Sequence, residues 1–171
     1  VRNIRYHNER CNQSRTALFG STSDLNLRDF IDTRQATVAE VKCRILYNNA
    51  VQHVEFHPYI LRPIQSLQHI EVGNYQYNHK FAERTQLDAF FAQRAACDDI
   101  LMTKNGLITD AYYAYVALSN GGPWITPKNP LLEGSSRARL IAKRQVVPMD
   151  IHLDQLKAFL SIMRFNAMLP F

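Results

Sequence analysis

The pair Asn105-Gly106 constrains the fold of this chain more than any other feature, because it lies between two β-prone runs. The runs cover 99–103 and 107–110. An Asn-Gly pair adopts the positive φ angles of the two-residue turn whose twist matches an antiparallel pair of strands. The sequence therefore predicts a β-hairpin over 99–110, which any fold of the chain has to contain.

A second hairpin is predicted nearer the N-terminus, where the alternating runs 41–47 and 51–57 flank Asn48-Asn49. Apolar residues spaced three to four apart predict several helices. These helices cover about 2–18, 24–30, 84–96, 137–143 and 153–163, and short strands are expected at 112–118 and 124–126. This order of elements indicates an α+β chain of two small α/β lobes, with a cofactor or ligand cleft between the lobes.

The two lobes are expected to meet at Gly73-Asn74, because an aromatic run and then a helical pattern begin directly after this pair. Residues 1–73 would form a small N-terminal lobe. Residues 74–171 would form a larger C-terminal lobe that holds the cofactor. The linker between the lobes would be short.

The composition indicates a packed protein that prefers small anions. The chain has 171 residues, of which 46% are hydrophobic, and this is enough to bury a core. Its formal charge is +5, but the 20 Lys and Arg residues are scattered, whereas a nucleic-acid groove needs basic residues clustered on one face. No signal peptide is recognised, and no apolar run approaches the roughly 20 residues that cross a bilayer. We expect a cytoplasmic protein that binds neither nucleic acid nor a membrane.

No metal site is expected from the cysteines and histidines. The cysteines lie far apart without a Cys-x-x-Cys pair, so they are expected to be reduced thiols. They are Cys11, Cys43 and Cys97. The histidines outside the motifs show no common helical spacing and no carboxylate partner at a fixed distance. They are His53, His57, His69 and His152.

Lys80 is the first candidate for chemistry. It lies among the rings of Tyr75, Tyr77 and Phe81, in a β-prone run that leads into a helix. Rings that line the end of a strand would remove solvent from the amine, which favours its neutral and nucleophilic form. The alternative is a surface lysine whose stem covers apolar side chains while its head stays in water.

Three further places could bind an anion or carry a charge. Ser135 and Ser136 open a predicted helix, where backbone N–H groups bind phosphate, although a serine can also cap the helix itself. Asp110 follows a strand, so its carboxylate either projects into a cleft or forms a turn. Arg10 lies on a helix among charged residues, and a solvated helix face is the alternative there.

Together these features resemble the pyridoxal-phosphate enzymes of the class IV aminotransferase family, which has fold type IV. This family includes branched-chain aminotransferases, D-amino acid aminotransferases and aminodeoxychorismate lyase. Five segments carry the resemblance, in the family's order and over most of the chain: His7-Asn-Glu-Arg10, Lys80 with Arg84, Leu107-Ile-Thr-Asp110, Gly134-Ser135-Ser136-Arg137 and Asn166-Ala-Met-Leu-Pro170. The last segment is similar to the end that is typical of the lyase branch.

The resemblance implies pyridoxal 5'-phosphate as the cofactor and assigns roles to residues of this chain. Lys80 would form the imine with the cofactor, and Asp110 would face the pyridine nitrogen. Arg10, Ser135 and Ser136 would hold the phosphate. The further cofactor contacts that the resemblance implies are Ala114, Tyr115, Asn166 and Ala167. A homodimer with its active sites beside the subunit interface is also implied.

The chain departs from the family's pattern in three ways. Asp110 is one methylene shorter than the family's glutamate, Ala114 and Tyr115 replace a Ser-Asn pair, and the family's opening strand is missing from the sequence. The first change weakens the expected contact to the pyridine nitrogen, and the second alters hydrogen bonding near the phosphate. At least one of Tyr112, Tyr113 and Tyr115 is expected to reach the cleft, because alternate residues of a strand face opposite sides.

The resemblance leaves the reaction open. The segment Asn166-Ala-Met-Leu-Pro170 and the modest length favour elimination of pyruvate from aminodeoxychorismate, which gives 4-aminobenzoate. Amino transfer between an amino acid and a 2-oxo acid, of the branched-chain or D-amino acid type, is the alternative. A cofactor-binding relative with weakened turnover is a further alternative, which the changes at Asp110, Ala114 and Tyr115 favour.

Overall fold

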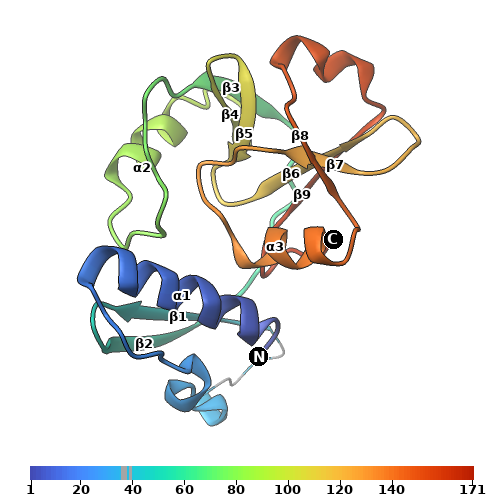
Figure 1. The fold of residues 1–171 in the computed structure, drawn as a ribbon. Coiled ribbons are helices and arrows are strands. Elements are labelled where there is room, and N and C mark those ends of the chain that lie inside the picture. The colour runs from blue at the N-terminus through green and yellow to red at the C-terminus, as the bar shows by residue number, and fades with distance from the viewer. Residues whose placement is uncertain (36–37, 39) are drawn as a thin grey trace. The chain divides into compact units, whose positions relative to one another are not determined.

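The computed structural model describes residues 1–35, 38 and 40–171, which form both helices and strands (Figure 1). The α+β class predicted from the sequence is confirmed. The described residues form two compact units, 1–62 and 63–171. Each unit has its own strand pairing, and the two are described separately.

The division between the units falls after Arg62, whereas the sequence pattern suggested a joint at Gly73. Strand β3 (Leu67–Glu71) explains the difference, because it pairs in parallel with β4 (Asp99–Lys104) of the second unit. Those hydrogen bonds make β3 part of a sheet in the second unit. The chain therefore leaves the first unit before it reaches the glycine.

The first unit combines one long helix with a hairpin. Its elements are α1 (Ile4–Phe19), the 3₁₀ turns η1 (Leu27–Phe30) and η2 (Thr33–Gln35), β1 (Val41–Tyr47) and β2 (Val51–Pro58). The helix predicted over 2–18 is confirmed as α1. Gly20, which follows the helix, has a φ of 65°, in the left-handed region that often ends a helix and favours glycine. The hairpin predicted over 41–57 is also confirmed, since β1 and β2 pair antiparallel.

Arg15 joins the parts of the first unit. It is only 2% exposed, and its Nη1 donates to Ser23 O at 2.7 Å while its Nη2 donates to Asn49 O at 2.8 Å. One guanidinium therefore ties α1 to the loop that follows it and to the turn of the hairpin. Carbonyls from two other segments thus satisfy donors of this buried guanidinium.

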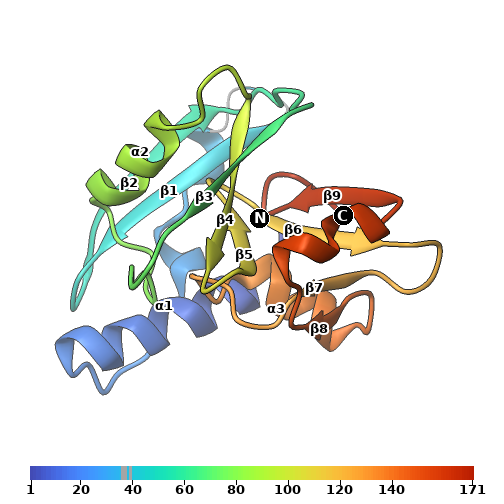
Figure 2. The same cartoon turned by 90° about the horizontal axis from the view of Figure 1, so that it is seen from above.

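The second unit contains two small sheets with helices around them. Its elements are β3, α2 (Thr85–Ala92), β4, β5 (Leu107–Ala111), β6 (Tyr115–Ser119), β7 (Ile125–Pro127), α3 (Ser135–Ala142), β8 (Val147–Met149), the 3₁₀ turn η3 (Leu153–Ala158) and β9 (Ser161–Phe165). One sheet has the strand order β3-β4-β5 and the other the order β8-β7-β6-β9. The pairs β3–β4 and β7–β8 are parallel, and the others are antiparallel. The short turn from β5 to β6 joins the two sheets, as Figure 1 and Figure 2 show.

The hairpin predicted over 99–110 is confirmed as β4 and β5. Asn105 and Gly106 have positive φ angles of 53° and 75°, as an Asn-Gly turn requires. The carboxylate of Glu71 braces this turn, because it accepts the N–H of Asn105 at 2.9 Å and that of Gly106 at 3.3 Å. It also accepts the hydroxyl of Thr103 at 2.6 Å. The turn is therefore fixed both by its own residues and by β3.

The helix expected over 153–163 is wrong. The chain there forms the 3₁₀ turn η3 and then strand β9, which pairs with β6 along the whole of 115–119. Phe165 at the end of β9 is completely buried. Strand pairing and burial outweigh the helical pattern, and neither can be recognised from the spacing of apolar residues within 153–163.

The strand expected within 75–84 is also wrong, since this segment is irregular. Its rings pack on one another and on α2 instead. The ring centres of Tyr75 and Tyr77 are 6.1 Å apart, and those of Tyr75 and Phe90 are 5.4 Å apart. Contacts between rings therefore replace the backbone pairing of a strand.

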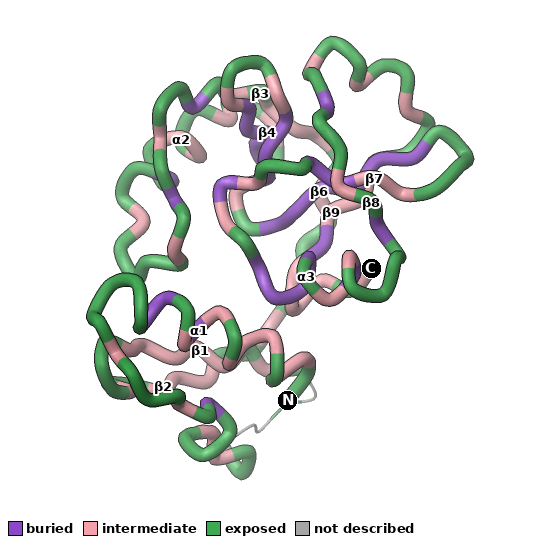
Figure 3. The backbone as a smooth tube through the Cα atoms, viewed as in Figure 1, coloured by how far each residue is buried: buried purple, intermediate pink, exposed green. Residues whose placement is uncertain are grey.

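The core of the second unit lies along β4, β5 and β6. Val116, Ala117 and Leu118 of β6 are completely buried on both faces of the strand. Figure 3 shows buried stretches in these strands and in the segment that leads into α3. Two acidic residues, Asp99 and Asp110, lie within this apolar region and are themselves buried. A buried carboxylate needs a partner.

Asp99 has its partner in Arg164. Asp99 of β4 is 3% exposed, and its Oδ2 lies 2.7 Å from Nη1 of Arg164 on β9. The pair links one sheet of the second unit to the other. Removal of one member of a buried pair leaves the other charge without compensation, which costs about 3–5 kcal/mol.

Arg164→Leu is therefore expected to lower the free energy of unfolding by about 3 kcal/mol or more, as measured by urea denaturation. Arg5→Leu is the control, because Arg5 pairs with Glu9 on the surface, where its side chain is 81% exposed. This control should stay close to wild type. Equal losses in the two variants would contradict a special role for the buried pair.

Candidate functional site

Asp110 has one oxygen without a partner. The residue lies in a buried stretch of β5 and is 5% exposed. Its Oδ2 accepts a hydrogen bond from Leu131 N at 2.5 Å. Its Oδ1 is also buried but has no hydrogen-bond partner among the described residues. A buried acceptor without a donor is rare in folded proteins, so this oxygen marks a place where a ligand could donate a hydrogen bond.

Burial raises the pKa of Asp110 to about 7. The N–H of Leu131 and the guanidinium of Arg137 oppose this rise, while Glu133 adds to it. The carboxyl group is therefore divided between its neutral and charged forms near neutral pH. A positively charged donor at Oδ1 would favour the charged form.

Helix α3 begins close to Asp110, because the segment after Leu131 leads directly into it. Ser135 and Ser136 lie in its first turn and are each 4% exposed. The residue at the N-cap is Gly134, so the alternative of a serine that caps the helix is wrong. Backbone N–H groups at the start of a helix, together with the positive end of its dipole, bind anions such as phosphate.

Tyr115 lies beside the start of α3. Its ring packs against Phe165 with centres 5.5 Å apart, and Ala114 before it is buried. A Cβ built at Gly134 would fall 1.8 Å from the hydroxyl oxygen of Tyr115. The glycine is therefore needed for close approach rather than for its backbone angle, since its φ is −103°. Of the three tyrosines named from the sequence, Tyr115 is the one whose hydroxyl lies against Gly134 at the start of α3.

Arg137 holds the segment between β7 and α3. It is 4% exposed, and its Nη2 donates to Pro127 O at 2.8 Å and to Lys128 O at 3.1 Å. Its Nη1 pairs with Glu133 at 2.9 Å. The sequence did not predict this anchor, because the carbonyls lie on a different segment and only the fold brings them to the guanidinium.

Lys80 lies in the irregular segment before α2 and is exposed. The burial of its amine by three rings, expected from the sequence, is not observed. Tyr77 is buried, but Phe81 is 44% exposed and its ring packs edge-on against that of Tyr77. Arg84 connects this segment to the rest of the site, because its Nη2 donates to Tyr112 O at 3.0 Å. The role of Lys80 stays a prediction.

The side-chain amide of Asn166 forms hydrogen bonds with backbone groups. Its Nδ2 donates to Tyr113 O at 3.0 Å, and its Oδ1 accepts the N–H groups of Met168 and Leu169, both at 2.7 Å. The amide thus forms the last turn of the described chain and holds the turn between β5 and β6. Cofactor contacts by Asn166 and Ala167 stay predictions.

Arg10 lies on α1 in the first unit. It is half-buried, and its Nε has no hydrogen-bond partner among the described residues. The charge of Arg10 acts on Cys11 and Tyr47, whose pKa values burial raises and Arg10 opposes. Its part in holding a phosphate stays a prediction.

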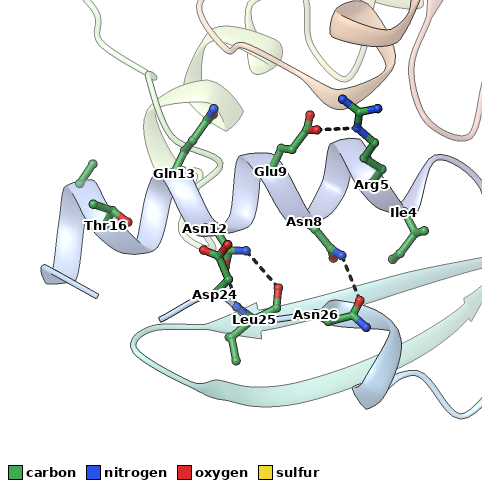
Figure 4. A pocket seen from close by; sticks show the side chains of 11 residues that line it. Ile4, Arg5, Asn8, Glu9, Asn12, Gln13, Thr16, Asp24, Leu25 and Asn26 are labelled. Atoms are coloured by element: carbon green, nitrogen blue, oxygen red, sulfur yellow. Dashed lines mark hydrogen bonds and ion pairs between the residues drawn. The ribbon is translucent and has the colours of Figure 1, made fainter. Parts of the chain in front are cut away.

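A groove runs beside α1 in the first unit (Figure 4). Its polar side chains bond to one another and to the nearby backbone. Asn8 Nδ2 donates to Asn26 Oδ1 at 3.0 Å, and Asn12 Nδ2 donates to Leu25 O at 3.1 Å. None of the predicted site residues is among the described residues that line it. We therefore assign no ligand to this groove.

Histidines and a carboxylate meet on β2. His53, Glu55 and His57 alternate along the strand and share one face. Glu55 lies 2.8 Å from His57 Nε2 and 3.6 Å from His53 Nε2, so these histidines do have a carboxylate partner, at strand spacing rather than helix spacing. Within 1–35, 38 and 40–171, no group of three or more His, Cys, Asp or Glu side chains is placed to hold a metal ion.

The part of the chain that the structure describes contains no helix that is both long and apolar enough to cross a membrane. The cytoplasmic location stays a prediction.

Comparison with known proteins gives no matching family model. An uncharacterized protein of Haemophilus influenzae is 28% identical over 171 residues, which cover 98% of this chain and 91% of that protein. The crystal structure of a "putative 4-amino-4-deoxychorismate lyase" from Haemophilus somnus 129pt is similar over 99% of this chain and 91% of its own, with a TM-score of 0.91 and 28% identity.

A hypothetical aminotransferase from Mycobacterium tuberculosis, in its PLP-bound form, is similar over 98% of this chain and 72% of its own. Its TM-score is 0.77 and its identity is 16%, so this likeness shows the fold alone. The fold predicted from the sequence is confirmed by these structures. The chain has the mixed α/β fold of the type IV, aminotransferase-like proteins.

Proposed function

We propose that this chain is a pyridoxal-phosphate-dependent enzyme of the class IV aminotransferase kind, with aminodeoxychorismate lyase activity. The observation that carries the proposal is the buried Oδ1 of Asp110 without a donor, close to a helix start that can bind an anion. The likeness to the Haemophilus somnus protein, which is named for this lyase, supports the proposal. The reaction would release 4-aminobenzoate and pyruvate.

The described residues fit pyridoxal 5'-phosphate at two points. The protonated ring nitrogen is a donor that would satisfy Oδ1 of Asp110. The start of α3 with Ser135 and Ser136 offers donors to the phosphate. Tyr115 is a further candidate for the phosphate, because its hydroxyl lies against the N-cap of α3. When bound, the cofactor supplies a carbonyl carbon that reacts with amines and a ring that withdraws electrons.

Asp110 would hold a positive charge where the protein excludes water. Its carboxylate would pair with the ring N–H, and this charge would lower its pKa from about 7 in the unliganded chain. The N–H of Leu131 and the guanidinium of Arg137 already favour the anion. Although the side chain of Asp110 is one methylene shorter than a glutamate, these two neighbours help to keep its carboxylate charged.

Lys80 would hold the cofactor through Nζ, and the same amine would move a proton to or from the substrate. An unperturbed lysine has a pKa of about 10.4 and is charged near neutral pH. Because Lys80 is exposed in the structure, the cofactor and the substrate themselves would have to exclude water from its amine. Ser135 and Ser136 would fix the phosphate and with it the orientation of the ring.

The same groups would also serve amino transfer, which is the alternative reaction. A cofactor-binding relative with weakened turnover is the second alternative, and the apolar Ala114 beside Tyr115 is the observation that favours it. The proposal includes a homodimer in solution, which light scattering after size exclusion would test.

Assay of the purified, cofactor-loaded chain distinguishes these functions. With aminodeoxychorismate it should form 4-aminobenzoate and pyruvate. Amino transfer to a 2-oxo acid without formation of 4-aminobenzoate would replace the lyase proposal with the alternative. Bound cofactor without either reaction would favour the weakened relative.

Borohydride reduction of the loaded protein is expected to attach the cofactor to Lys80, as read by mass spectrometry of its peptides. Lys80→Ala should lose this adduct, because no other amine is proposed to bond to the cofactor. Lys143→Ala is the control, since Lys143 follows α3 and is exposed. If Lys80→Ala protein carries the adduct at the wild-type ratio, Lys80 has no part in the mechanism.

The raised pKa of Asp110 predicts that the stability of the unliganded protein falls as the pH rises. An aspartate titrates near 3.9 when unfolded and near 7 in this fold, so the folded state holds the proton more tightly. The stabilisation is complete below about pH 4 and is lost as the pH rises through about 7. Between pH 5 and pH 8, wild type should lose roughly 2–3 kcal/mol more than Asp110→Asn in urea denaturation. Equal pH dependence in both proteins would show that Asp110 is not the group responsible.

Gly134→Ala is expected to lower both the melting temperature and the affinity for pyridoxal 5'-phosphate. Its Cβ would fall 1.8 Å from the Tyr115 hydroxyl, and such overpacking costs about 1–3 kcal/mol. Gly122→Ala is the control, because its Cβ would lie 3.6 Å from Asn120 Oδ1, an ordinary contact. Identical melting curves for the two variants would mean that Tyr115 does not press on the start of α3.

A further inference from the structure

We infer that Arg84 is a positioning residue that fixes Lys80 relative to Asp110. The inference rests on the proposed function, because it takes these two side chains as the ones that act on the cofactor. Arg84 itself would touch neither the cofactor nor the substrate. Its effect would pass through the turn between β5 and β6.

The guanidinium of Arg84 packs against two adjoining aromatic rings, whose centres are 4.2 Å apart. Its Cζ lies 4.6 Å from the ring centre of Tyr112 and 4.0 Å from that of Tyr113. At the same time its Nη2 donates to Tyr112 O at 3.0 Å. A planar guanidinium can stack on rings with its faces while it donates with its edge, which an ammonium cannot do.

The ring of Tyr112 is fixed from its other side by α2. It stacks on Phe91 with centres 4.1 Å apart and planes inclined by 13°. Its hydroxyl donates to Asp88, also on α2. The backbone of Tyr113 is held by Asn166, whose Nδ2 donates to its carbonyl at 3.0 Å. The turn that Arg84 contacts is therefore rigidly supported.

This clamp joins two segments close to the proposed reacting groups. Arg84 follows Lys80 by four residues, and Tyr112 follows Asp110 by two. The segment 75–84 is irregular, so no strand pairing fixes the course of the chain around Lys80. The stacked guanidinium takes the place of that pairing. A displacement of about 1 Å between reacting groups can cost about a hundredfold in rate, so such a connection matters for chemistry.

Arg84→Met tests the inference, because it keeps the length of the side chain and removes the guanidinium. Arg94→Met is the matched control. Like Arg84, Arg94 packs on a ring and donates to a carbonyl: its Cζ lies 4.2 Å from the ring centre of Phe91, and its Nη1 donates to Phe91 O at 3.2 Å. Arg94, however, follows the C-terminal end of α2, whereas Arg84 precedes its N-terminal end. Each variant loses one arginine that packs on the stacked pair formed by Phe91 and Tyr112, Arg84 on the ring of Tyr112 and Arg94 on that of Phe91.

The two readouts are the dissociation constant of pyridoxal 5'-phosphate and the pH midpoint of the visible absorption of the loaded protein. Arg84→Met should weaken binding about tenfold, the effect of losing a stacked cation, and should move the pH midpoint. Arg94→Met should leave both within about twofold of wild type. A merely structural role would lower the melting temperature but would not move the pH midpoint.

Equal changes in Arg84→Met and Arg94→Met, or wild-type values in both, would overturn the inference. Tyr113 keeps the test open if Arg84→Met does not fold, because Tyr113 is 58% exposed and can be replaced with little effect on the core. Tyr113→Leu should change both readouts in the direction of Arg84→Met, and Tyr113→Phe, which keeps the ring, should restore them. Wild-type protein that binds no cofactor would instead refute the proposed function.

Discussion

A carboxyl group inside an apolar sheet region is the constraint on which the second unit depends. Asp110 lies on β5 among buried residues, where a charge is costly unless it is paired. The N–H groups of Leu131 and Leu132 and the guanidinium of Arg137 favour the charged form, but Oδ1 has no hydrogen-bond partner among the described residues. The fold thus places an acid with one buried oxygen that a ligand could satisfy. This incomplete pairing gives the proposed site its chemistry.

Arginines that bind backbone carbonyls hold the rest of the architecture together. Arg15 in the first unit and Arg137 in the second are almost fully buried, and each donates to carbonyls on a different segment from its own. Arg84 does the same for the turn between β5 and β6. The strands and helices of the second unit are short, so long loops need anchors, and a planar group with five donors supplies several hydrogen bonds at once. These arginines therefore connect segments that the short strands and helices do not connect.

The sequence predicts those parts of the fold whose signals are local. The hairpin over 99–110 follows from one Asn-Gly pair, and the start of α3 follows from a glycine and two serines. Strand β9 was missed, because its pairing with β6 joins residues far apart along the chain and nothing near 161–165 records it. Register between distant strands depends on the assembled core, which a single sequence does not display.

For the candidate site the same limit applies. The sequence placed Asp110 at the end of a strand, either in a cleft or in a turn, but its burial and its hydrogen bond from Leu131, twenty-one residues further on, required the fold. The exposure of Lys80 agrees with the alternative of a surface lysine, since the rings around it were expected to line a strand end and instead pack on one another and on α2. Residue types identified the candidates, while the distances between them required the fold.

The contact between Tyr115 and Gly134 has a consequence for how this chain can evolve. The two positions lie on different elements, yet the hydroxyl of one fills the space that any side chain of the other would need. Position 134 therefore cannot gain a side chain while Tyr115 keeps its place. A descendant that gains a side chain at position 134 must first shrink the residue at position 115, and would in the same step open the wall beside α3 to larger guests.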